Sequence, residues 1–224
     1  MKLQWGLVAS ALCVSLVACG SGGNSGAPPA APSPTPSANR APVINSLNFA
    51  PQFGIMGVTQ YAFNASASDP DGDPLNYSWD LAGNPFSGTN GTITFSSGGN
   101  GVARLTVTDS RGATTQDTRT FVVGTASGSW LVTSGPLTGA SFNLTQSVTG
   151  LVTGSFSLPG IGNGNTDPAQ PGRIDGGAQL TMRVKIAPFT DFNMTGTMDS
   201  TGRQVSGNLQ GSGFTGQAFT MTKQ

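Results

Sequence analysis

Short apolar runs in which every second residue is hydrophobic dominate the chain from residue 41 to residue 124. In the run from Arg104 to Thr108, Leu105 and Val107 fall on one side of an extended chain and the hydroxyl side chains on the other. This alternation is typical of an antiparallel strand with one buried face. Strands are predicted at residues 43–47, 59–67, 75–81, 91–95, 103–108 and 115–123. Short strands at this spacing indicate a two-sheet β-sandwich at residues 41–124.

The same period of two continues from residue 128 to residue 224. Strands are predicted at residues 129–134, 140–149, 151–158, 178–186, 191–198, 204–209 and 214–222. Turns with glycine, such as Asp199–Gly202, separate them, which is typical of an antiparallel meander. Seven such strands can close into a small barrel and so remove exposed sheet edges. The long connection at 159–177 is predicted to be a loop, either a mobile lid or a plain insertion.

The first residues of the chain have a different pattern. Lys2 is followed by an uncharged run from Gly6 to Ala18, the order of regions found in a secretory signal peptide. That run is too short to span a bilayer as an anchor. Leu16-Val17-Ala18-Cys19 resembles the lipobox of bacterial lipoproteins. An ordinary signal peptide with an incidental cysteine, or a short buried helix, remains the alternative.

The lipobox resemblance implies that residues 1–18 are removed and that Cys19 carries acyl chains. Two or more chains hold a protein firmly at a membrane, so Cys19 would be a lasting tether. Gly20 stands at the second mature position, where the family resemblance implies export to the outer membrane. Residues 19–40, rich in Gly, Ser and Pro, then form a linker between the lipidated cysteine and the first folded region.

The amino-acid composition argues against several classes of function. The chain has 10 Lys and Arg against 10 acidic residues, all Asp, so there is no positive field to attract nucleic acid. There is no His, Cys13 would be removed with the signal peptide, and Cys19 would be acylated. This excludes His-dependent catalytic triads, the usual zinc sites and a disulfide. The Asp residues of the second region stand in or beside predicted turns. We therefore expect a protein without enzymatic activity.

Two segments of the first region carry a family resemblance. Residues 69–80 read DPDGDPLNYSWD and residues 105–113 read LTVTDSRGA, and together they resemble a polycystic-kidney-disease-type (PKD) domain. The resemblance implies an Ig-like β-sandwich of the kind used in surface proteins as a spacer or interaction module. Trp79 is expected between the two sheets. The chain departs from the family at Leu81-Ala82-Gly83, where the family commonly has an acidic turn.

Asp69, Asp71 and Asp73 form the one cluster of the chain with the spacing of a metal site. Alternating carboxylates in a tight turn can converge on a hard cation, and Ca²⁺ is bound by six to eight oxygen atoms. Asn39, at the entrance of the domain, is a further candidate oxygen donor. A bound Ca²⁺ would stiffen the junction with the linker. In the alternative interpretation these residues only build the turn through hydrogen bonds to the backbone.

Three methionines of the second region, Met182, Met194 and Met198, alternate with polar residues and are expected to point inward. Methionine is flexible, so these residues can line an adaptable apolar pocket, or they can simply be core. Residues 128–130 (Gly-Ser-Trp) and the recurring Val-Thr-Gly pieces resemble small β-barrel modules of other bacterial lipoproteins, without ligand residues to carry over.

The sequence thus predicts an all-β protein of the outer membrane: a lipid-anchored, non-catalytic lipoprotein with an Ig-like sandwich and an antiparallel meander or small barrel. It is expected at the periplasmic or the cell-surface face. Its partners would be the membrane, through the lipid, and a protein or a glycan, but not nucleic acid. The alternative function is a carrier of a small apolar ligand in the C-terminal domain.

Overall fold

The computed structural model describes residues 37–185 and 191–224, and within them the chain forms strands joined by turns, with no helix. The predicted all-β class is therefore confirmed. No helix among these residues is long and apolar enough to cross a membrane. The predicted signal peptide at 1–18 and the predicted lipidation site at Cys19 lie outside the described residues.

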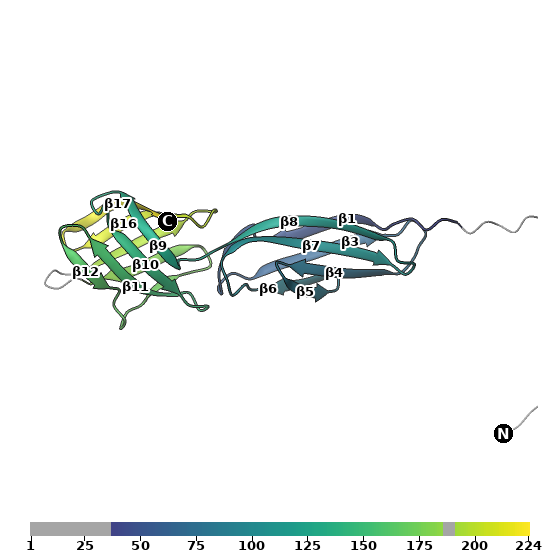
Figure 1. Ribbon diagram of the computed structural model, residues 1–224, viewed down its shortest axis with the longest axis horizontal. Coiled ribbons are helices and arrows are strands. Elements are labelled where there is room, and N and C mark those ends of the chain that lie inside the picture. The colour runs from purple at the N-terminus through teal and green to yellow at the C-terminus, as the bar shows by residue number, and fades with distance from the viewer. Residues whose placement is uncertain (1–36, 186–190) are drawn as a thin grey trace, which may run out of the picture. The chain divides into compact units, whose positions relative to one another are not determined.

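The first domain is a sandwich of two sheets (Figure 1). A three-stranded sheet has the order β1 (Val43–Ala50), β3 (Tyr61–Ser68) and β6 (Asn90–Ile93). A five-stranded sheet has the order β2 (Phe53–Ile55), β8 (Thr114–Gly124), β7 (Gly99–Asp109), β4 (Leu75–Leu81) and β5 (Asn84–Ser87). Two strands were not predicted. The pairing of β2 with β8 is parallel, and β5 has no buried residue, so neither strand leaves an alternating pattern in the sequence.

The core of the sandwich matches the sequence pattern. Leu105 and Val107 are fully buried, and Trp79 is 1% exposed, as predicted for a ring between the sheets. The indole Nε1 of Trp79 donates a hydrogen bond to the carbonyl of Gly88 at 2.9 Å. The ring of Phe63, from the other sheet, lies 4.9 Å from that of Trp79. A buried indole with a satisfied N–H adds packing without the cost of an unpaired donor.

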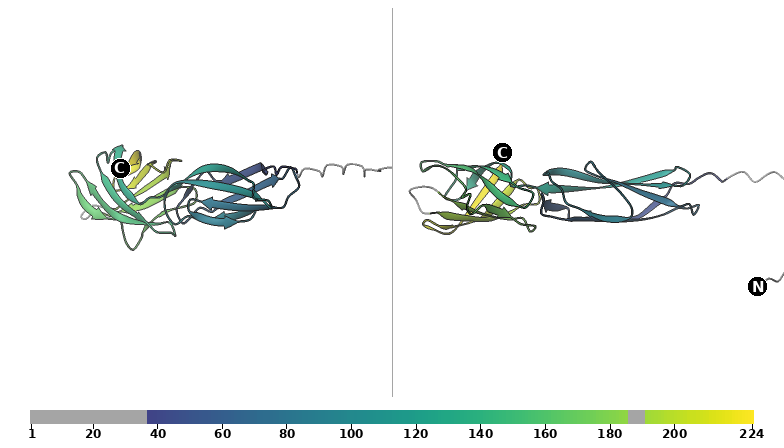
Figure 2. Two further views of the ribbon diagram at one scale, coloured as in Figure 1. Left: turned by 45° about the vertical axis from the view of Figure 1, so that its right-hand side comes forward. Right: turned by 90° about the horizontal axis from the view of Figure 1, so that it is seen from below.

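The second domain is a closed antiparallel barrel of eight strands (Figure 2). Around the ring they are β9 (Gly128–Ser134), β10 (Ser141–Gln146), β11 (Leu151–Leu158), β13 (Gly172–Ile174), β14 (Gln179–Val184), β15 (Phe192–Met198), β16 (Gln204–Gly211) and β17 (Phe214–Lys223). Pairing of β17 with β9 closes the ring, and β12 (Gly162–Asn165) pairs only with β11.

The prediction of one long loop at 159–177 was wrong, and so was the count of seven strands. This segment contains β12 and also β13, the strand that joins β11 to β14 and completes the ring. β13 is only three residues long, with Arg173 exposed and Ile174 fully buried. A strand with one inward apolar side chain shows no periodicity, and the hydrogen bonds of its neighbours define it instead.

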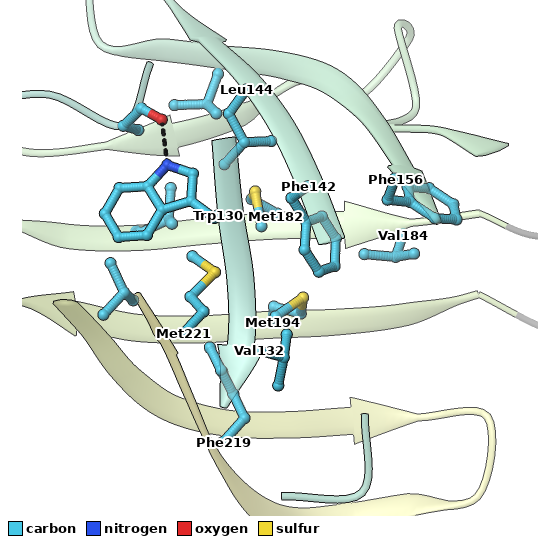
Figure 3. Packing of buried hydrophobic residues seen from close by; sticks show 14 of the residues in the cluster. Trp130, Val132, Phe142, Leu144, Phe156, Met182, Val184, Met194, Phe219 and Met221 are labelled. Atoms are coloured by element: carbon cyan, nitrogen blue, oxygen red, sulfur yellow. Dashed lines mark hydrogen bonds between the residues drawn. The ribbon is translucent and has the colours of Figure 1, made fainter. Parts of the chain in front are cut away.

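The interior of the barrel is filled by side chains from all around the ring (Figure 3). Trp130 is fully buried, and its Nε1 donates a hydrogen bond to the carbonyl of Ala126 at 2.8 Å. The buried residues labelled in Figure 3 are Trp130, Val132, Phe142, Leu144, Phe156, Met182, Val184, Met194, Phe219 and Met221. Apolar packing of this kind stabilises the barrel in place of a disulfide.

The two domains belong to one compact unit, residues 38–224, and share buried contacts. Ile55, from the sandwich, is 1% exposed and belongs to the core cluster of the barrel. The amide of Gln146, on β10, bridges the domains: its Oε1 accepts from the N–H of Ala126 at 2.7 Å and its Nε2 donates to the carbonyl of Met56 at 2.9 Å. Gly57 has φ +71°, and a Cβ there would lie 2.1 Å from the carbonyl oxygen of Val148, so the contact requires glycine.

Candidate metal centre

The turn from Asp69 to Asp73 directly follows β3 and begins with a side chain bound to the backbone. The Oδ1 atom of Asp69 accepts hydrogen bonds from the N–H groups of Asp71 at 2.8 Å and Asp73 at 3.1 Å. Gly72 adopts φ +80°, a conformation that favours glycine. One carboxylate oxygen from each of the three Asp residues lies within 4.8 Å of the others. The structure therefore brings the predicted triplet together and also gives Asp69 its turn-forming bonds.

A second turn, at Asp109, lies beside the first because β7 pairs with β4. The last pair of that ladder joins Asp109 to Leu75, two residues after Asp73. The Oδ1 of Asp109 accepts from the N–H groups of Arg111 and Ala113, and its Oδ2 accepts from Nδ2 of Asn39 at 2.9 Å. Burial raises the pKa of Asp109, but the hydrogen bonds from Asn39 and the backbone outweigh it, so the net pKa lies below the usual value.

Two arginines neutralise part of the cluster. The Nη2 of Arg40 lies 2.7 Å from Oδ1 of Asp71, and the Nη2 of Arg111 lies 2.7 Å from Oδ2 of Asp73. The hydrogen bond from the Arg40 side chain is the largest cause that lowers the pKa of Asp71, and the bond to Asp73 raises the pKa of Arg111. Arg40 therefore holds Asp71 in its charged form.

Two buried oxygen atoms, Oδ1 of Asn39 and Oδ2 of Asp69, have no hydrogen-bond partner within residues 37–185 and 191–224. A buried acceptor without a donor is costly, and a hard cation would satisfy it as well as an N–H group would. The atoms that could bind a metal ion here are all oxygens, which are the ligands that Ca²⁺ prefers. These residues fit such an ion, and Asn39 and Asp69 carry the strongest indication.

Sequence reasoning missed three residues of this centre: Asp109, Arg40 and Arg111. Asp109 was not among the predicted ligands, although it is 3% exposed and its carboxylate accepts a hydrogen bond from the side chain of Asn39. A signal was present, because the turn Asp109–Gly112 repeats the Asp-x-x-Gly spacing of Asp69–Gly72. The antiparallel pairing of the strands that flank these turns would then have placed both at the same edge.

The three predicted ligand-binding methionines lie inside the barrel. Met182, Met194 and Met198 are 2%, 1% and 3% exposed, and all belong to its core cluster. Met182 and Met194 are direct cross-strand partners on β14 and β15, surrounded by other buried side chains (Figure 3). All three side chains are therefore buried within the apolar cluster of the barrel.

Comparisons with known proteins identify the first domain as a PKD domain. Residues 39–123 match the family model described as PKD domain. The crystal structure of the PKD1 domain of Vibrio anguillarum Epp is 30% identical, over 38% of this chain and 96% of that one, with a TM-score of 0.32. The PKD1 domain of the Vibrio cholerae metalloprotease PrtV is 23% identical, over 38% of this chain and 98% of that one, with a TM-score of 0.32.

A carbohydrate-binding module of the beta-sandwich superfamily is 14% identical, over 83% of this chain and 92% of that one, with a TM-score of 0.37. A search of curated proteins gave no match.

Proposed function

We propose that this chain, in which a PKD domain precedes a closed eight-stranded barrel, is a lipid-anchored, non-catalytic protein of the outer membrane that binds a protein or a glycan. The observation that carries the proposal is the filled interior of the barrel, which leaves its outer surface as the part that meets a partner. The PKD domain would space the barrel from the lipid. The signal-like residues 1–18 and the linker at 19–40 support the anchor.

The carboxylates of the barrel support a role without catalysis. Asp191 forms an ion pair with Arg183 at 2.7 Å. Asp175 and Asp199 accept hydrogen bonds from the backbone of their own turns. Groups used in this way have structural partners instead of a substrate, and the sequence contains no His to act as a general base.

Replacing Cys19 by serine is expected to release the protein from the membrane. The thiol is the atom that would carry the lipid, and serine would not be acylated, so the variant should move to the soluble fraction of a bacterial host. Fractionation and intact mass of the purified chain measure this. The matched control is Cys13→Ser, which should stay at the membrane. A Cys19→Ser variant that remains in the membrane fraction would contradict the proposed anchor.

Dye binding distinguishes the interaction module from the alternative, a carrier of an apolar ligand. With a filled interior, the full chain is expected to bind a hydrophobic dye only weakly and without saturation. A saturable one-to-one complex that is lost in Met194→Gln, while the variant stays folded, would instead support the carrier and remove the observation on which our proposal rests.

We also propose that Asn39, Asp69, Asp71 and Asp73 hold a Ca²⁺ ion that stiffens the entry of the chain into the PKD domain. The two buried oxygens without donors, one on Asn39 and one on Asp69, support this. The ion would be held next to Arg40, the last residue of the predicted linker, and so would restrict the motion of the linker against the domain.

Asp69→Asn is expected to weaken Ca²⁺ binding at least about tenfold, because it removes a charge while keeping an oxygen for the turn. Calorimetric titration of the full chain with CaCl₂ measures the affinity, and the rise in Tm with Ca²⁺ provides a second readout. The control is Asp117→Asn, whose carboxylate pairs with Arg119 on the surface of β8. Equal Ca²⁺ affinity in wild type and Asp69→Asn would rule out the site.

A further inference from the structure

A hollow of about 600 Å³ lies where the end of the PKD domain meets the barrel. Its lining includes Asn100 of the PKD domain and Ser200, Arg203 and Lys223 of the barrel. The volume falls within the range of sites for small molecules, about 300–1,000 Å³. It is separate from the Asp69 cluster and from the barrel interior.

Two positive side chains face each other at this hollow. Gln204 of β16 pairs with Thr222 of β17, and the N–H of Lys223 donates to the carbonyl of Arg203 at 2.8 Å, so Arg203 and Lys223 form the next cross-strand pair. Like charges directly opposite each other are destabilising. Among residues 37–185 and 191–224, neither side chain takes part in an ion pair.

Asp199, in the same turn, is in no ion pair with either cation among the residues that the structure describes. Oδ1 of Asp199 accepts from the N–H groups of Arg203 and Gln204, each at 3.0 Å. Its Oδ2 accepts from the hydroxyl of Thr201 at 2.6 Å. Asp199 therefore builds the turn that presents Arg203.

Lys223 is half-buried and has lost part of its water. Its Nζ donates to the carbonyl of Thr125 at 2.9 Å and lies 5.3 Å from the centre of the Trp130 ring. Burial, and secondly the charge of Arg203, lower its pKa. The contacts of the ammonium with described residues are thus with neutral groups, and an anion in the hollow would be stabilised by both cations.

The rest of the wall offers groups that both donate and accept hydrogen bonds. The side chains of Asn100 and Ser200 are exposed and line the hollow, and Gly99 has open space where a side chain would stand. An amide and a hydroxyl match the hydroxyl groups of a sugar ring, which also donate and accept.

We propose that this hollow binds a carboxylate-bearing sugar unit of an acidic glycan, with the carboxylate against Arg203 and Lys223 and the ring hydroxyls against Asn100 and Ser200. The inference rests on the proposed function and specifies that the partner is a negatively charged glycan.

Calorimetric titration of the full chain with trigalacturonate tests the proposal, with the fully methyl-esterified trisaccharide as the uncharged probe. Arg203→Gln is expected to weaken binding of the acidic probe at least about tenfold, and Lys223→Gln by a similar factor. The control Arg173→Gln removes an exposed arginine on β13 and should leave the affinity unchanged. Arg203 is exposed, so its variant should keep the wild-type Tm even if Lys223→Gln does not.

Three outcomes would overturn the inference: no binding of trigalacturonate by the wild-type chain, equal binding of the esterified probe, or equal loss in Arg173→Gln. Hexaglutamate that binds at the same residues more tightly than trigalacturonate would assign the hollow to an acidic peptide instead. A chain that is anchored through Cys19 and binds a protein or neutral glycan, but not trigalacturonate, would remove this inference and leave the proposed function standing. A chain that binds trigalacturonate but is not anchored through Cys19 would remove the lipid anchor from the proposed function and leave this inference standing.

Discussion

Trp130→Ala is expected to lower the free energy of unfolding of the barrel by about 3–5 kcal/mol, the range for truncation of a large buried aromatic side chain. Trp130 has no exposed surface, and it lies inside the ring between β10 and β17. The change would leave a cavity and would also leave the carbonyl of Ala126 without its 2.8 Å donor. Urea denaturation followed by circular dichroism measures the loss.

Two variants separate packing from hydrogen bonding. Trp130→Phe keeps part of the ring but not the N–H, so it should cost less than the alanine variant, though still more than a surface change. Ile161→Ala, at a side chain that is 48% exposed, should stay within about 0.5 kcal/mol of wild type. If Trp130→Ala were as stable as Ile161→Ala, the filled interior of the barrel would be refuted.

Gln146→Leu is expected to cost about 2–4 kcal/mol and to uncouple the two domains. Leucine fills a similar volume but leaves the N–H of Ala126 and the carbonyl of Met56 without partners, and each buried orphan group costs about 1–3 kcal/mol. Because these bonds join the PKD domain to the barrel, the unfolding transition should separate into two. Calorimetry resolves this as two peaks in place of one.

Gln179→Leu is the matched control for Gln146→Leu. The side chain of Gln179 is exposed, and its amide donates to the hydroxyl of Thr197 at 2.7 Å, so its loss should change stability by less than about 0.5 kcal/mol. Gln146→Glu keeps the oxygen that accepts from Ala126, but its ionised carboxylate would be buried against the carbonyl of Met56, so it should cost more than the loss of the Met56 bond alone. A single unshifted transition in Gln146→Leu would show that the domains are not coupled through this amide.

Much of the candidate metal centre could be predicted from the sequence, because its central part is local. Asp69, Asp71 and Asp73 lie in one turn, where the spacing of alternating residues already brings the carboxylates together. Asn39 and Asp109 are 70 positions apart, and only the pairing of β7 with β4 places Asp109 beside the triplet. The Arg203 and Lys223 pair was not predicted, since it depends on the register between β16 and β17.

The methionines show the limit of an alternating pattern. It correctly placed Met182, Met194 and Met198 on the inward face of their strands. The same pattern is produced by a residue that lines a pocket and by one that fills a core. The difference lies in the distance to side chains from the opposite wall, which no local pattern contains.

By itself the sequence determined the all-β class and the burial of Trp79, because a strand with one buried face repeats every second residue. Tertiary structure decided what depends on distant partners. β13 is a strand because β11 and β14 offer free hydrogen-bonding edges on both of its sides. Gln146 is buried because its amide meets two backbone groups, one from the loop after β2 and one from the segment that joins the domains. Both β13 and Gln146 depend on hydrogen bonds to residues that are distant in the sequence. Neither has an alternating apolar pattern or a motif from which these partners could be predicted.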